Sequence, residues 1–351
     1  LGAAPVVEVR KALTPMGTGS DPEADTMDAL PSAPSSEDDS GRTRAAVEQV
    51  LGEATPEAPF VGRESELEIL ERALRESREG ALRAVFVEGE SGVGKTALKD
   101  AFVARVEERG GTVLGGRCYE HERVPYKAFD GIVDALARDL ARRHDDQVSR
   151  LLPAGGALLA QVFPVLGRVT AKARDSVGVI PRDGLELRDL CFRMLADLLD
   201  ALAQEEPVVL TVDDFQWADA DSLRLFEVLA ERASLLVVAT LREPTAEVIA
   251  LADAWTRLPL ERLNRRDAEA LARVQAPEGV DVSALAEQAN GHPLLIAELA
   301  RHAQGRRGPV SIRGVIRERL DALAPEQRNL VIGAALAVRP ITPLLGADVA
   351  G

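Results

Sequence analysis

The chain has 351 residues, enough for two or three domains with a substantial buried core. Its formal net charge of −15 disfavours broad binding to nucleic acid or to anionic membranes, although a local basic site remains open. Two cysteines without Cys-rich spacing indicate a reducing compartment and no disulfide framework. We find no signal peptide and no apolar run long enough to cross a bilayer, so we expect a cytoplasmic protein. Because the chain begins with Leu, we expect it to be part of a longer protein.

The first 58 residues differ in composition from the rest. They are rich in Ala, Pro, Ser, Gly, Asp and Glu and lack the apolar surface needed for a packed core, which predicts a disordered linker over 1–58. Order is expected from residue 59, followed by a helix that places Leu67, Leu70 and Leu74 on one face.

Residues 89–96 read Gly-Glu-Ser-Gly-Val-Gly-Lys-Thr, the pattern G-x-x-x-x-G-K-[ST] of a phosphate-binding loop. A β-rich run at 82–88 precedes it, and a helical pattern carrying Leu98, Phe102 and Val106 follows. The alternative is a chance glycine-rich turn, which these flanks disfavour. We therefore expect this loop to join a strand to a helix and to hold the phosphates of ATP or ADP.

The loop chemistry assigns roles to individual residues. Glycines let the backbone wrap closely around phosphate oxygens, and the N–H groups of the loop and of the helix start attract the anion. Lys95 would reach the β- and γ-phosphates, and the Thr96 hydroxyl would hold Mg²⁺. The expected nucleotide-binding residues of this segment are Gly89, Glu90, Ser91, Gly92, Val93, Gly94, Lys95, Thr96 and Ala97.

Downstream patterns predict the rest of an α/β fold. A second strand is expected at 112–118 and helices at 126–139 and 186–203, with a long, mostly helical insertion between them. The run at 207–214 is apolar and ends in Asp213 and Asp214, as a buried parallel strand with acids at its carboxyl end would. Asp213 would sit on the Mg²⁺ side and Asp214 would orient the attacking water, unless the pair is only a solvated turn.

A fourth strand is expected at 235–242 and a fifth near 257–263. Thr240 would sense the γ-phosphate or the nucleophilic water, and Arg242 would act as an arginine supplied in cis. The competing interpretation of Arg242 is a surface ion pair with Glu243 or Glu247. Short helices follow at 265–274, 283–288 and 293–302, and two more precede the end of the chain.

Several segments together resemble one family. They are Phe60-Val61-Gly62-Arg63-Glu64, the phosphate loop, the Asp213-Asp214 strand with Gln216-Trp217-Ala218-Asp219, Thr240-Leu241-Arg242, and Gly291-His292-Pro293-Leu294. In this order they are similar to the STAND class of signalling P-loop ATPases, relatives of the AAA+ and origin-recognition ATPases. The run from Cys118 to Gly131 is similar to ATPase modules fused to bacterial serine/threonine protein kinases, and related modules occur in large LuxR-type regulators.

The resemblance implies a five-stranded parallel sheet of order 5-1-4-3-2 with helices on both faces. It divides the chain into the linker, an ATPase core over 59–263, a helical lid over 264–308 and the truncated start of a winged-helix domain over 309–351. Val61 and Gly62 would lie against the adenine, with Pro293 of the lid on its other side. Asp214 stands where many AAA+ relatives carry Glu, which implies slow hydrolysis.

Three functions follow as hypotheses. The first is a slow, Mg²⁺-dependent ATPase switch of a signalling protein, with protein partners or self-association in the ATP state and an upstream kinase implied by the resemblance. The second is a nucleotide-gated scaffold with negligible turnover, and the third is the ATPase part of a LuxR-type regulator. The acidic balance disfavours DNA as a partner of this chain. Kinase catalysis by the chain itself is disfavoured because it contains no H-R-D or D-F-G motif.

Overall fold

A computed structural model describes residues 60–120, 126–171, 183–243, 248, 256–304 and 311–336. Contacts divide the chain into Leu1–Pro59 and Phe60–Gly351, and every described residue belongs to the second unit. The linker expected over 1–58 lies outside the described residues.

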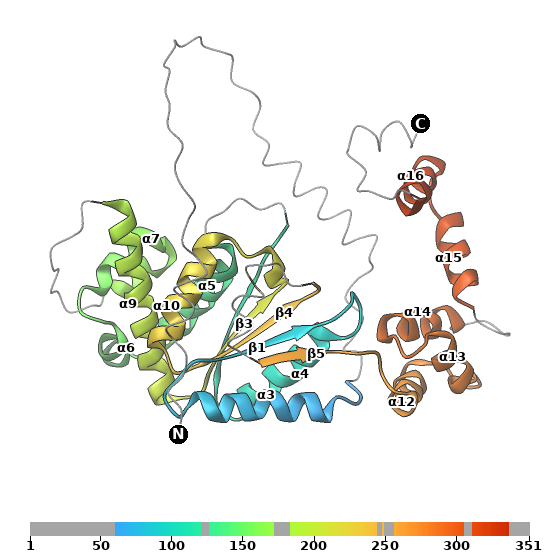
Figure 1. Cartoon of the computed structure of the whole chain (residues 1–351), viewed down its shortest axis with the longest axis horizontal. Helices are drawn as coiled ribbons and strands as arrows, with labels where there is room; N and C mark the ends of the chain where they lie inside the picture. Colours follow the sequence, from blue (N-terminus) through green and yellow to red (C-terminus); the bar gives the residue numbers. More distant parts are fainter. Residues whose placement is uncertain are drawn as a thin grey trace, which may run out of the picture. The chain divides into compact units, whose positions relative to one another are not determined.

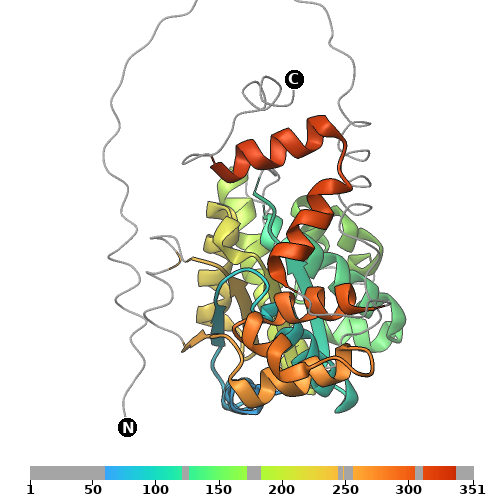
Figure 2. The same ribbon diagram turned by 90° about the vertical axis from the view of Figure 1, so that its right-hand side faces the viewer.

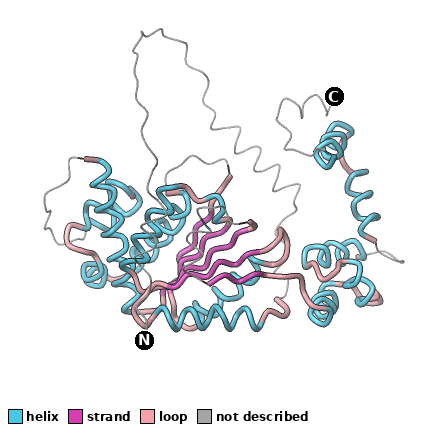
Figure 3. Tube along the Cα trace, viewed as in Figure 1, coloured by secondary structure: helices cyan, strands magenta, loops and turns pink. Residues whose placement is uncertain are grey.

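A five-stranded parallel sheet forms the centre of this unit, with the strand order β2-β3-β4-β1-β5 (Figures 1 and 3). This is the expected order 5-1-4-3-2 read from the other edge, so that prediction is confirmed. The strands are β1 (Arg83–Glu88), β2 (Thr112–Arg117), β3 (Val208–Asp213), β4 (Leu236–Leu241) and β5 (Thr256–Pro259). Every residue of the central strand β4 is buried, as expected for a parallel sheet covered on both faces.

The two faces of the sheet carry different cores. Successive strand residues point to opposite faces, and in β1 Ala84 and Phe86 join one hydrophobic cluster while Val85 and Val87 join the other. The second cluster is completed by α3 (Glu64–Ser77) and α4 (Lys95–Glu108), and the first by α5 (Lys127–Arg142), α9 (Gly184–Glu205) and α10 (Ala220–Arg232). Helices therefore cover both faces (Figure 1), as predicted.

The segment between α5 and α9 is mostly short helices in its described part, which agrees with the expected helical insertion. They are α6 (Asp145–Leu151), α7 (Leu159–Val162) and α8 (Gly167–Thr170), with 3-10 turns at Gly156–Leu158 and Pro164–Leu166. The ring of Phe163 stacks on that of Phe192 with centroids 6.4 Å apart, and Tyr126 meets both rings edge-on. This aromatic contact attaches the insertion to α5 and α9.

The helices after β5 have a core of their own, and we call α12 to α14 the lid. They are α12 (Arg265–Gln275), α13 (Val282–Gln288) and α14 (Pro293–Ala303). Val315 of α15 (Ile312–Asp321) packs in the same cluster, and α16 (Pro325–Leu336) follows (Figure 2). The described part of the expected winged-helix segment thus consists mainly of the helices α15 and α16, and the rest of that segment lies outside the described residues. Among the described helices, none combines the length and apolarity required of a membrane span.

Candidate functional site

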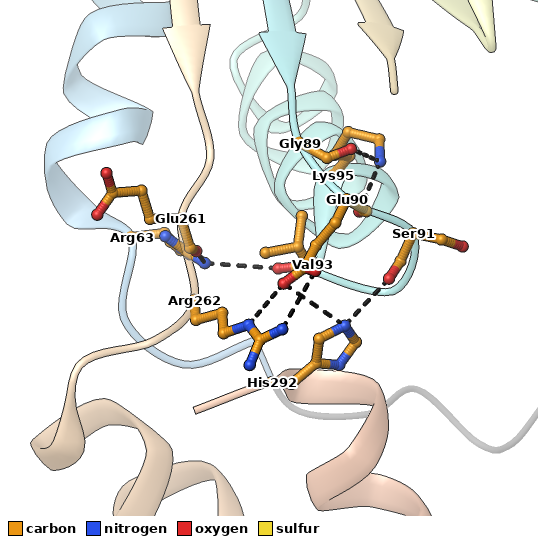
Figure 4. Close-up of polar contacts among 9 residues, drawn as sticks. All are labelled: Arg63, Gly89, Glu90, Ser91, Val93, Lys95, Glu261, Arg262 and His292. Atoms are coloured by element: carbon orange, nitrogen blue, oxygen red, sulfur yellow. Dashed lines mark hydrogen bonds and ion pairs between the residues drawn. The ribbon is translucent and has the colours of Figure 1, made fainter. Parts of the chain in front are cut away.

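The loop at 89–96 connects β1 to α4, which confirms the predicted strand–loop–helix arrangement (Figure 4). Gly92 and Gly94 have φ values of 79° and 103°, a left-handed region that disfavours side chains. A Cβ on Gly92 would also lie 2.8 Å from both the His292 Cε1 and the Leu294 Cβ. Both glycines are therefore favoured by the turn, and Gly92 is required also by the close approach of the lid.

Lys95 is the first residue of α4, at the end of the loop, and is buried. Its ammonium donates hydrogen bonds to the carbonyl oxygens of Gly89 at 2.7 Å and Glu90 at 2.9 Å. Burial is the main factor that lowers the pKa of Lys95, and the charge of Arg242 lowers it further, while Asp213 and Asp214 act in the opposite direction. The ion pair between Lys99, one helical turn after Lys95 on α4, and Asp213 at the end of β3 places the start of α4 and the acid pair at the same carboxyl edge of the sheet.

The acid pair is held by Thr240 of the neighbouring strand. The Thr240 hydroxyl donates to Asp213 Oδ1 at 3.0 Å and accepts from the Asp214 N–H at 3.2 Å. Asp214 itself has a φ of 56°, so the chain turns sharply between the two acids. Thr240, expected at the γ-phosphate, thus directs its hydroxyl proton to Asp213.

Two cations that pattern reasoning missed contact these acids. Lys99 forms an ion pair with Asp213 Oδ2, and Arg117 Nη2 lies 3.0 Å from Asp214 Oδ2. Their positions in the sequence could have pointed to them. Lys99 lies one turn beyond Lys95 on the same helix face, and Arg117 pairs in register with Asp213 across β2 and β3. The direction of their side chains was not predictable from spacing.

Magnesium fits this site as an ion held mainly by phosphate and water. Thr96 is exposed at the first turn of α4, and Asp213 supplies a carboxylate. In the described part of the chain, no three His, Cys, Asp or Glu side chains gather as a metal-binding group. Mg²⁺ characteristically uses one or two protein oxygens and takes its other ligands from water and substrate phosphates, so this donor set is sufficient.

The residues expected at the adenine lie where the lid meets the core. Val61 packs against the hydrophobic cluster of the lid. Gly62, with a φ of 73°, approaches α12 so closely that a Cβ would lie 2.8 Å from Asp267 Oδ2. Pro293 at the start of α14 has its Cγ 3.9 Å from the position of a Cβ on Gly94. Ala97, also expected at the nucleotide, is exposed on the first turn of α4.

Two arginines, one in β5 and one just after it, form ion pairs with acids around the loop. Arg262 makes a two-pronged contact with Glu90 at 2.6 and 3.2 Å, and Arg257 makes one with Glu88 at 2.7 Å on both prongs. The hydrogen bond from Arg262 is the main factor that lowers the pKa of Glu90. These pairs fix the segment that leads into the lid beside the phosphate loop, and no sequence motif predicted them.

The chain is similar to several known proteins. A hybrid signal transduction histidine kinase G of Dictyostelium discoideum is 25% identical over 180 residues, a match that covers 48% of this chain and 5% of that protein's length. A STAND protein with a tetratricopeptide repeat sensor from Pyrococcus horikoshii is 17% identical with a TM-score of 0.46, covering 85% of this chain and 41% of the other. The DNA-bound Drosophila ORC structure gives 13% identity and a TM-score of 0.40, covering 94% and 82%. TM-scores below 0.5 carry no functional argument.

The family comparison covers more of the chain. The sequence profile described as "AAA ATPase domain" matches residues 59–241, more than half of the 351 residues. The match contains the phosphate loop, the acid pair and Thr240, the groups that the fold brings to one edge of the sheet. The chain belongs to the AAA ATPase domain family.

Proposed function

We propose that the chain is a Mg²⁺-dependent ATP-binding module that hydrolyses ATP slowly and acts as a switch in a larger signalling protein. The observation that carries this proposal is the ion pair between Lys99 of α4 and Asp213 of β3, which brings the helix of the phosphate loop against the acid pair at one edge of a parallel sheet. Ligands of open parallel α/β sheets bind at the carboxyl ends of the strands. The hybrid histidine kinase relative supports the signalling context by its name alone.

Each residue has a proposed role in the reaction. The loop N–H groups and Lys95 bind the phosphates, while Thr96 and Asp213 hold Mg²⁺, which would neutralise charge on the β- and γ-phosphates. Asp214 orients the attacking water, Thr240 keeps the two acids in register, and Arg242 stabilises the γ-phosphate. Val61, Gly62 and Pro293 enclose the adenine between the core (59–263) and the lid (264–308).

Slow turnover is supported by the contacts of the acids. Asp214 Oδ2 is engaged by Arg117 at 3.0 Å, and Asp213 is engaged by both Lys99 and Thr240. Arg117 occupies Asp214 Oδ2, so this oxygen has to release its partner before it can accept a hydrogen bond from the attacking water. The same contacts favour the second candidate, a nucleotide-gated scaffold with negligible turnover.

Single-turnover hydrolysis separates the two candidates. We expect slow phosphate release by the wild-type protein. Release by Asp214→Asn should be at least about 100-fold slower, in keeping with the contribution of a positioned base. This variant should still bind ATP. The switch proposal is contradicted if hydrolysis is equal in wild type, Lys95→Ala and Asp214→Asn. Tight binding with no measurable release in the wild type would establish the scaffold instead. Cytoplasmic location, self-association and the winged-helix start at 309–351 belong to the same proposal.

A further inference from the structure

Three consecutive carbonyl groups of the phosphate loop accept hydrogen bonds from outside the loop. The Ser91 oxygen lies 3.1 Å from His292 Nε2, the Gly92 oxygen accepts the Leu294 N–H at 3.3 Å, and the Val93 oxygen accepts from Arg63 Nη2 at 3.4 Å. His292 and Leu294 flank the start of α14 in the lid, and Arg63 precedes α3. The donors therefore come from two segments far apart in the sequence.

These bonds face away from Lys95. In Figure 4, Lys95 lies on one side of the loop, and Arg63 and His292 approach from the other. In a trans peptide the C=O and N–H groups point in opposite directions. Holding the carbonyls of residues 91, 92 and 93 outward therefore directs the N–H groups of Gly92, Val93 and Gly94 inward. The Val93 N–H has this inward direction. Its nitrogen donates a hydrogen bond at 3.4 Å to the Glu90 carbonyl oxygen, which also accepts from the Lys95 ammonium.

We propose that His292, the Leu294 N–H and Arg63 are positioning groups that preset the loop's inward N–H groups to receive the phosphates of a nucleoside di- or triphosphate. None of the three needs to contact the ligand, since they act through the peptide planes of residues 91–94. Consecutive backbone N–H groups that point into one concavity form an anion site. The lid thereby controls phosphate affinity as well as any contact with the base. This inference rests on the proposed nucleotide-binding function.

His292 is the group of the three most suited to this role. Its side chain is only 9% exposed, and its Nδ1 is buried with no hydrogen-bond partner in the described part of the chain. The ring therefore satisfies the Ser91 carbonyl through one nitrogen at the cost of leaving the other unpaired. Glu90, 4.0 Å from His292 Nε2 and held by Arg262, fixes the adjoining part of the loop.

The test compares ligands with and without the phosphates that enter the loop. Affinities of ADP and adenosine are measured for wild type and His292→Ala by displacement of a fluorescent ADP analogue. We expect the ADP dissociation constant to rise about tenfold, the usual consequence of losing one hydrogen bond, and adenosine affinity to stay unchanged. The carboxamide of His292→Gln can donate from a similar position, so this variant should recover most of the ADP affinity.

Matched variants keep the result interpretable. His302→Ala removes another histidine of α14, which contacts Glu318, and should leave both affinities unchanged. Arg63→Met should weaken ADP binding selectively, in the same direction as His292→Ala. Melting curves without nucleotide identify any variant that fails to fold, and in that case Arg63→Met decides the question.

Two results overturn the inference. One is unchanged ADP affinity in folded His292→Ala or Arg63→Met, and the other is an equal loss of ADP and adenosine binding, which would assign His292 to the base. Failure of the proposed function gives a different result, because the wild type would then not bind ADP.

Discussion

Lys99 and Asp213 form an ion pair at the carboxyl edge of the sheet, between α4 and the end of β3. The second oxygen of Asp213 accepts the Thr240 hydroxyl at 3.0 Å, so both carboxylate oxygens are engaged. Both ionic side chains are largely buried, with 13% of Lys99 and 18% of Asp213 exposed. Asp213, the carboxylate proposed to hold Mg²⁺, is therefore already paired with the ammonium of Lys99. The ammonium would compete electrostatically with Mg²⁺ for the same oxygen.

Removing this cation should increase the apparent affinity for magnesium. We expect Lys99→Met to lower the Mg²⁺ concentration needed for half-maximal ATP binding by about three- to tenfold, which corresponds to about 1 kcal/mol. The measurement is a Mg²⁺ titration at fixed ATP analogue, read by fluorescence. Lys99→Arg keeps the charge and should behave as wild type. An unchanged or higher Mg²⁺ midpoint in Lys99→Met would show that Lys99 does not compete with the metal.

Releasing the second acid should accelerate hydrolysis. Arg117→Met removes the partner of Asp214 Oδ2, and we expect single-turnover hydrolysis to rise by roughly three- to tenfold, because the oxygen can then accept a proton from water. Arg109→Met is the control, since Arg109 pairs with Glu71 at the far end of α4. A slower reaction in Arg117→Met would mean that the arginine holds Asp214 in its active position.

The lowered pKa of Lys95 predicts a pH effect of definite sign. Burial makes the folded protein release this proton below the ordinary pKa of 10.5, while the unfolded chain still holds it. Stability contributed by this group therefore rises as pH increases from the folded pKa towards 10.5. Over the same range ATP affinity should fall, because neutral Lys95 no longer attracts phosphate. The test measures the melting temperature and the ATP affinity of wild type and Lys95→Met across this pH range. With rising pH, the wild type alone should gain in melting temperature while it loses ATP affinity.

Gly92 provides a steric test of the contact between lid and loop. Gly92→Ala places a methyl group 2.8 Å from His292 Cε1 and Leu294 Cβ at a φ of 79°, so we expect a destabilisation of about 2–3 kcal/mol and weaker ADP binding. Gly110→Ala has nearly the same φ, 78°, but nothing within 4 Å of its Cβ, so it should cost about 1 kcal/mol and leave binding intact. Denaturant unfolding of both variants measures the difference, and equal losses would exclude a tight lid contact.

Sequence patterns predicted the backbone of the site better than its side-chain contacts. Local motifs and strand hydrophobicity predicted the loop between β1 and α4 and the polar ends of β3 and β4. These features depend on residues that are adjacent in the sequence. The pairs Lys99–Asp213, Arg117–Asp214 and Arg262–Glu90 join residues far apart in sequence, and long side chains have too many rotamers for spacing to choose between them. His292 was predictable only as part of a turn because its partner, the Ser91 carbonyl, lies 201 residues away.

One strand also differed in extent. β5 was expected near 257–263, but it covers Thr256–Pro259. Within the described residues it is an edge strand paired with β1 on one side, so the chain after Pro259 can leave the sheet and turn towards the lid. The last residues of the predicted strand instead supply Arg262 to Glu90 and Leu263 to the lid core.

Equilibrium binding of ATP in the presence of Mg²⁺ tests the central claim most directly, because every proposed role depends on a phosphate chain within the loop at 89–96. Calorimetry should show one ATP bound per wild-type chain and at least about a tenfold loss of affinity in Lys95→Ala, since a charge-assisted contact to phosphate is removed. Absence of ATP binding by the folded wild type, or equal affinity in Lys95→Ala, would contradict the account.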